Sequence, residues 1–166
     1  MGFVSHLPTY PQEAAKREAA QGPPGPAGGY ASWGQRVGAY LLDVLIVFGA
    51  LIVVGAALAG ISAGFGGGDL AFGVILIAIL AVPIGYYVYF VGNERGQTYG
   101  RRVVGIQVRS DTFGPVGYGR ALGRYLITFV FGFFTLPLII DYLWPLWDSR
   151  NQTLHDKAAS TVVVRV

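Results

Sequence analysis

A long apolar run begins at Val37: residues 37–68 read VGAYLLDVLIVFGALIVVGAALAGISAGFGGG, and Asp43 is the single charged residue among them. The run is long enough to cross a hydrocarbon core, which takes about 20 apolar residues. A charged side chain inside a membrane helix costs roughly 2.5–3.5 kcal/mol on insertion scales. Asp43 therefore needs a partner, a water-filled cavity or a place near the membrane interface. Arg36 and the later arginines are the basic candidates.

The overall composition is that of a membrane protein, because 53% of the 166 residues are hydrophobic and only 13% are charged. A second apolar run, Leu70–Gly92, carries no charge, and a third, Tyr125–Ile140, is shorter and contains Pro137. We expect a mainly α-helical integral membrane protein with two transmembrane helices, the first from Val37 to about Ile61. A helical hairpin broken at Pro137, or a single third span, follows them.

The basic residues are distributed unevenly around these runs. No Lys or Arg lies in the loop 62–69. Six arginines follow the second run: Arg95, Arg101, Arg102, Arg109, Arg120 and Arg124. The positive-inside rule then places the N-terminus and residues 93–124 in the cytoplasm. Residues 102–109 and 161–166 each have the pattern of a short strand, and we expect them to pair, because a lone strand is unstable. This pairing puts the C-terminus in the cytoplasm too and favours the hairpin for residues 121–147.

The composition of residues 1–29 and the absence of cysteine limit the domain organisation and the kinds of site that we expect. Residues 1–29 contain five prolines and no apolar segment, so we expect a disordered Pro/Gly-rich tail ahead of a single domain at 30–166. With no cysteine and two histidines, no metal site is expected. No cofactor loop or activated nucleophile is apparent either, so we expect neither an enzyme nor a nucleic-acid partner.

Several polar residues are candidates for a site. Arg36 and Asp43 are seven positions apart, so they share one face of a helix, with Asp43 about 10 Å deeper. That face can line an ion path or hold a structural pair. Arg124 can reach Asp43 or extend to the membrane interface. Asp141 has the position of an interfacial carboxylate. His155 can titrate near neutral pH, although a surface or capping histidine is the favoured interpretation.

Four motifs resemble the RDD family of small bacterial membrane proteins, which is named for one arginine and two aspartates. They read WGQRVGAYLLD at 33–43, GQTYGRRVVGIQV at 96–108, GRALGRY at 119–125 and QTLHDKAASTVVV at 152–164. The resemblance covers about residues 30–166. It implies that Arg36 is the family's arginine, Asp43 its first aspartate and Asp156 its second. Ser160 departs from the pattern, because a glycine is usual before the last strand.

The resemblance implies a multi-pass protein of the bacterial inner membrane, embedded in the lipid bilayer, whose family has no settled activity. Transport has been suggested for the family, and cation–proton exchange for some members. We expect a transport-related protein for a cation, a proton or a small solute, with Arg36, Asp43 and Asp156 forming its polar site. So few helices favour a homo-oligomer. The alternative is a non-transporting scaffold or accessory subunit whose arginine-rich face binds anionic lipid or a partner.

Overall fold

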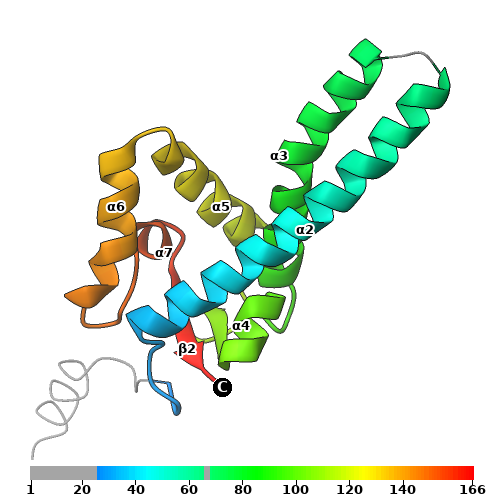
Figure 1. Ribbon diagram of the computed structural model, residues 1–166. Coiled ribbons are helices and arrows are strands. Elements are labelled where there is room, and N and C mark those ends of the chain that lie inside the picture. Colours follow the sequence, from blue (N-terminus) through cyan, green and yellow to red (C-terminus); the bar gives the residue numbers. More distant parts are fainter. Residues whose placement is uncertain (1–25, 66–67) are drawn as a thin grey trace, which may run out of the picture.

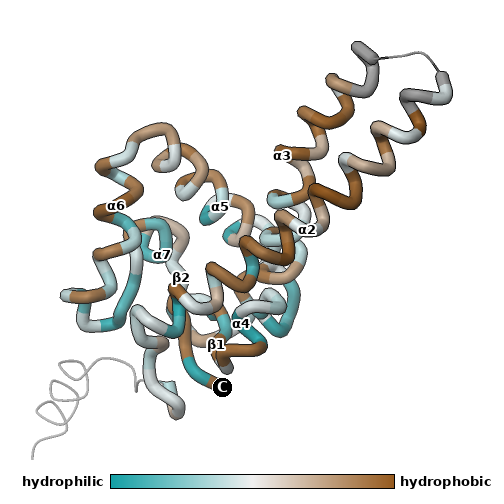
Figure 2. Tube along the Cα trace, in the orientation of Figure 1, coloured by the Kyte–Doolittle hydropathy of each residue, from teal (hydrophilic) through white to brown (hydrophobic). Residues whose placement is uncertain are grey.

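Two long helices form a hairpin that projects from the rest of the protein (Figure 1). The computed structural model describes residues 26–65 and 68–166. Helix α2 spans Trp33–Phe65 and helix α3 spans Gly68–Gly92. Much of the projecting hairpin is hydrophobic (Figure 2), which is typical of helices surrounded by lipid. Both helices are long and apolar enough to cross a membrane, in agreement with the two predicted spans.

The base of this hairpin rests on a two-stranded sheet. Strand β1 (Ile106–Ser110) pairs antiparallel with strand β2 (Thr161–Arg165), as the sequence predicts. The predicted start of the first strand is wrong, because helix α4 occupies Tyr99–Val104. The Thr98 side chain caps the start of α4, and Gly105 ends it in the left-handed conformation. The chain therefore forms a short helix of six residues before it enters the sheet.

A second, shorter helical hairpin lies beside the first (Figure 1). Its elements are α5 (Tyr118–Gly132), α6 (Thr135–Leu143) and the 3₁₀ turn η1 (Trp144–Leu146), and α7 (Leu154–Ala158) follows before β2. With 15 and 9 residues, α5 and α6 are about 22 and 14 Å long, so neither arm covers a core of about 30 Å.

The residues that break this hairpin differ from the prediction. The helices are interrupted at Phe133 and Phe134, and Pro137 lies in the first turn of α6. A proline is tolerated there because the amide that it lacks would have no partner within the helix. The prediction of a hairpin rather than one long helix agrees with the structure, whereas the prediction that Pro137 causes the break is wrong.

The N-terminal approach to α2 belongs to the folded domain. The predicted tail extends to residue 29, but the structure describes the chain from residue 26, and the earlier part of that tail lies outside the described residues. The Gly29 carbonyl accepts a hydrogen bond from Arg165 N, and Tyr30 forms a β-bridge with Val164. The chain ahead of α2 thus pairs with β2 at Gly29 and Tyr30.

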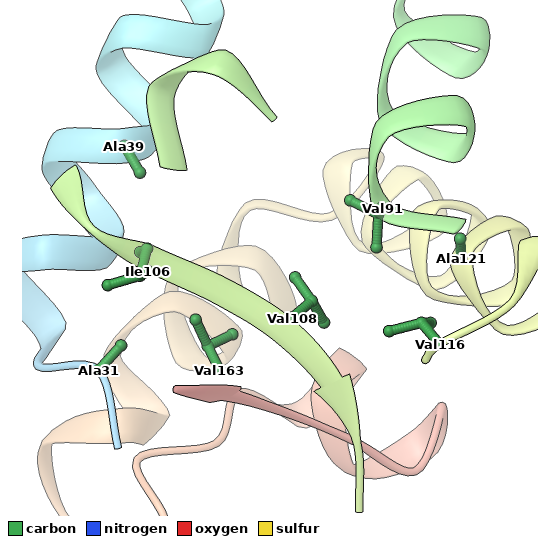
Figure 3. Packing of buried hydrophobic residues seen from close by; sticks show 8 residues of the cluster. All are labelled: Ala31, Ala39, Val91, Ile106, Val108, Val116, Ala121 and Val163. Carbon is green, nitrogen blue, oxygen red and sulfur yellow. The ribbon is translucent and has the colours of Figure 1, made fainter. Parts of the chain in front are cut away.

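Buried aliphatic side chains join the sheet to the ends of the helices (Figure 3). The cluster comprises Ala31, Ala39, Val91, Ile106, Val108, Val116, Ala121 and Val163. These residues come from α2, α3, α5, both strands and two connecting segments. Burying apolar surface stabilises this arrangement by about 25 cal/mol per Å². The cluster fixes where α2, α3 and α5 leave the sheet, and this placement positions the polar groups above it.

Candidate functional site

Asp43 lies at the junction of α2, α3 and α4, where its side chain is buried. Its carboxylate accepts three hydrogen bonds: from the Tyr86 hydroxyl at 2.7 Å, from Thr98 Oγ1 at 2.6 Å and from Gly100 N at 2.8 Å. Hydrogen bonds to a charged acceptor are worth about 1.5–3 kcal/mol each. Asp43 therefore fastens the start of α4 to the two long helices.

The close approach of α4 to α2 requires a glycine at position 100. A Cβ there would collide with the backbone oxygen of Ala39 and would lie 2.8 Å from Asp43 Oδ1. The arginines that the sequence offers as candidate partners form no ion pair with Asp43 in the described part of the chain. Neutral donors satisfy this carboxylate instead.

Asp156 forms ion pairs with Arg36 and Arg124, two arginines that the sequence offers as candidate partners of Asp43. Its carboxylate lies 2.6 Å from Arg36 Nη1 and 2.7 Å from Arg124 Nη2, and it is fully buried. With Thr153 it also forms a capping box at the start of α7. Burial alone would raise the pKa of Asp156, but the guanidiniums of Arg124 and Arg36 outweigh it and hold the pKa well below its usual range. This buried cluster, which we call the Asp156 clasp, ties α2, α5 and α7 together.

His155 and Asp141 form a second buried pair beside the clasp. His155 Nδ1 lies 2.6 Å from Asp141 Oδ2, and the His155 backbone N donates to Asp141 Oδ1 at 2.9 Å. The other ring nitrogen lies 3.2 Å from Arg124 Nη2. Because arginine only donates, this nitrogen is the acceptor, and Nδ1 carries the proton that Asp141 accepts. Burial lowers the pKa of His155, which agrees with a neutral ring.

The positions of these two side chains correct the sequence analysis. His155 was expected to be a surface or capping histidine and Asp141 an interfacial carboxylate, and the structure buries both, with His155 in the first turn of α7. The capping box was visible as Thr153 and Asp156 at the spacing T-x-x-D, an acidic form of the usual signature. Its presence places His155 in the first turn of a helix. The identity of the partner across the fold could not be read from that spacing.

A cavity of about 440 Å³ lies among α2, α3, α5 and α6, next to the clasp. Three guanidiniums line it, from Arg36, Arg101 and Arg124, together with one carboxylate, that of Asp43. Two of these arginines are incompletely paired: Arg36 Nε and Nη2 and Arg101 Nη1 are buried without a hydrogen-bond partner. Both side chains line the cavity, so positive charge predominates in its wall, and some of their nitrogens lack an acceptor.

Arg101 is the residue that sequence reasoning missed. Over the described residues its guanidinium forms no hydrogen bond or ion pair, whereas Arg102, its exposed neighbour, lies over the Tyr99 ring. The pair of arginines was visible in the motif at 96–108. Since the sequence predicted a strand from residue 102 and not the helix α4, the directions in which Arg101 and Arg102 point were not predictable.

Fold and site together define an integral membrane protein in which a hairpin of two apolar helices is held to a small sheet by buried carboxylates. The chain belongs to the RDD family, whose model matches residues 30–160. The suspected resemblance is thereby confirmed.

Curated relatives share part of this chain. It is 33% identical over 100 residues to a protein of Mycobacterium tuberculosis named proline-rich antigen homolog, and 35% identical over 100 residues to the proline-rich antigen of Mycobacterium leprae. These matches cover 60% of this chain and about 40% of each relative. An uncharacterized protein of Haemophilus influenzae is 32% identical over 103 residues, covering 61% of this chain and 63% of that protein. No solved structure matches this chain.

Proposed function

We propose that this RDD-family membrane protein binds an anion in the cavity beside the Asp156 clasp. The observation that carries the proposal is that three arginines and one carboxylate line the cavity, with nitrogens of Arg36 and Arg101 buried without a hydrogen-bond partner. A buried donor without an acceptor costs about 1–3 kcal/mol, and more when it is charged. An anion supplies the missing acceptors and is matched to guanidinium geometry.

The charges that line the cavity favour an anion over the cation expected from the family resemblance. Three guanidiniums and one carboxylate line the cavity. Asp156 does not line it and is paired with Arg36 and Arg124. Asp43 already accepts three hydrogen bonds. Among the described residues, no three acidic or histidine side chains gather as they would around a metal ion. In our proposal, any transport by this protein therefore concerns an anionic solute.

A membrane orientation accompanies the proposal. We infer a multi-pass protein of the bacterial inner membrane, with the sheet and both ends of the described chain on the cytoplasmic side. The arginines between 93 and 124 support this orientation through the positive-inside rule. Because the sequence contains no cysteine, a membrane-impermeant maleimide can label only the single cysteine introduced by G67C or by V166C. Labelling of the G67C variant from outside the cell, without labelling of V166C, is expected, and the reverse pattern would overturn the orientation.

The test of anion binding uses titration calorimetry on detergent-purified protein. The probes are inorganic phosphate, methyl phosphate and octyl phosphate. R101Q removes a guanidinium whose side chain has no partner in the described structure, so the fold should be preserved. R102Q is the matched control, because Arg102 is adjacent and exposed. We expect at least one probe to bind with an affinity that R101Q lowers tenfold or more and R102Q leaves unchanged. If R101Q changes the affinity for none of them, the proposal is wrong.

A scaffold without transport is the second candidate. It is favoured by the way the three family residues are used: Arg36 and Asp156 join α2 to α7, and Asp43 joins α2 to α3 and α4. This role predicts that D43N lowers the amount of folded protein in the membrane. It also predicts no change in solute flux across vesicles that contain equal amounts of folded D43N and wild-type protein.

A further inference from the structure

We propose that the ligand of this cavity is an anionic amphiphile with a single apolar chain: its phosphate-like head group lies at the arginines, and its chain lies between α2 and α5. This inference rests on the proposed anion-binding function and names the class of ligand. The chain would enter from the lipid bilayer.

The first support is a polarity gradient along the α2 wall of the cavity. The lining runs from Trp33 to Leu51. Its two charged residues, Arg36 and Asp43, lie in the first half, and it ends with Val47, Phe48 and Leu51. These positions recur at helical spacing, so they share one face of α2. The fifteen residue-to-residue steps from Arg36 to Leu51 correspond to about 22 Å along the helix axis. An inorganic anion would occupy only the charged end of such a length.

The α5 wall repeats this gradient, and the α3 wall is uncharged. On α5, Arg124 lies near the clasp, and Thr128 and Phe129 follow toward the far end of the helix. On α3, Val91 belongs to the core at the sheet, and Pro83 lies two turns further away from it. On α2 and α5 the charged residues thus lie toward the sheet, and apolar residues of all three helices line the end of the cavity that is remote from it. A head group and a chain would each meet a matching environment.

The apolar end of the cavity is continuous with the lipid-facing surface. Phe48 and Phe129 line the cavity, yet they are 61% and 41% exposed. α3 packs against both α2 and α5, which leaves the space between α2 and α5 to the cavity. The volume of about 440 Å³ lies in the range of about 300–1,000 Å³ usual for sites of organic ligands. A chain can therefore pass from the bilayer into the cavity without crossing a polar barrier.

The test compares phosphate esters that share one head group. Methyl and octyl phosphate are titrated into the protein at measured free monomer concentrations. Each CH₂ that is fully buried from water strengthens binding about fourfold. Because detergent competes for the chain, we expect octyl phosphate to bind about a hundredfold more tightly than methyl phosphate. R101Q should weaken octyl phosphate at least tenfold, R101K should weaken it less, and R102Q should leave it unchanged.

A second variant probes the chain separately from the head group. L51W fills the apolar end, so it should weaken octyl phosphate about tenfold and leave any measurable affinity for methyl phosphate unaltered. Equal, Arg101-dependent affinities for the two esters would overturn the amphiphile and leave the anion-binding proposal standing. Chain-length dependence without any effect of R101Q would mean simple partitioning and would overturn both. Undiminished octyl phosphate binding by L51W would also exclude the proposed path of the chain.

Discussion

Replacing Asp156 by asparagine should strongly destabilise this protein, because it removes the carboxylate that pairs with both Arg36 and Arg124. D156N keeps the size of the side chain and one oxygen for the capping box at Thr153. It removes the charge that lies 2.6 Å from Arg36 and 2.7 Å from Arg124. The new amide nitrogen would also lie against guanidinium N–H groups, and it cannot accept a hydrogen bond from them.

The size of the expected stability loss follows from the burial of both the carboxylate and the two guanidiniums. Asp156 is fully buried, and the Arg36 and Arg124 side chains are only 11% and 8% exposed. Removing one partner of a buried ion pair costs about 3–5 kcal/mol, because the remaining charge stays desolvated. K157Q is the control, since it breaks the pair of Lys157 with Asp148, and Lys157 is 43% exposed. Because solvent screens the Lys157 end of this pair, the pair should contribute less than about 1 kcal/mol.

The assay is reversible unfolding in mixtures of non-ionic detergent and dodecyl sulfate, followed by tryptophan fluorescence. We expect the free energy of unfolding to fall by about 3–5 kcal/mol in D156N and by less than about 1 kcal/mol in K157Q. Combining D156N with R36Q should cost less than the sum of the single changes, with a coupling of about 1 kcal/mol or more. Additive effects, or equal losses in D156N and K157Q, would refute the role of the clasp.

Three further variants test other parts of the structure. G100A should lose about 2–4 kcal/mol of unfolding free energy, because a Cβ there displaces α4 from Asp43, whereas G123A, with open space at its Cβ, should not destabilise. S160G should gain about 0.5 kcal/mol, since Ser160 has a positive φ of 50°; a loss would contradict this strain. The lowered pKa of buried His155 means that stability is complete above its unfolded pKa of about 6.5 and declines as the pH falls below it. Unfolding titrations at pH 7.5 and 5.5 should show this decline in the wild type and not in H155N.

The membrane helices and the pairing of the strands were predictable because both depend on local pattern. An uncharged run such as Leu70–Gly92 has few alternatives to a spanning helix. Two short β-branched segments that cannot be stable alone have each other as partners. The start of β1 was predicted wrongly for a local reason as well, because the cap at Thr98 and the left-handed Gly105 outweighed the strand propensity of the residues between them.

The partners of the charged residues were not predictable in the same way. Helical spacing places Arg36 on one face with Asp43, but the carboxylate that Arg36 contacts is Asp156, 120 positions away. His155 and Asp141 meet through the return of the chain after α6. Such contacts depend on how the ends of the helices are placed by the core around the sheet, and no period in the sequence encodes that placement.

Hydrophobicity alone thus makes this chain a membrane protein, because an apolar run of this length pays no penalty in lipid and a large one in water. It also marks Asp43 as a carboxylate that must be satisfied. Which donors satisfy it, and which arginines remain unpaired in the cavity, is decided by the tertiary structure. The physical reason is that desolvation acts on each residue separately, whereas hydrogen bonds and ion pairs require two groups within about 3 Å, and only the folded chain brings distant groups that close.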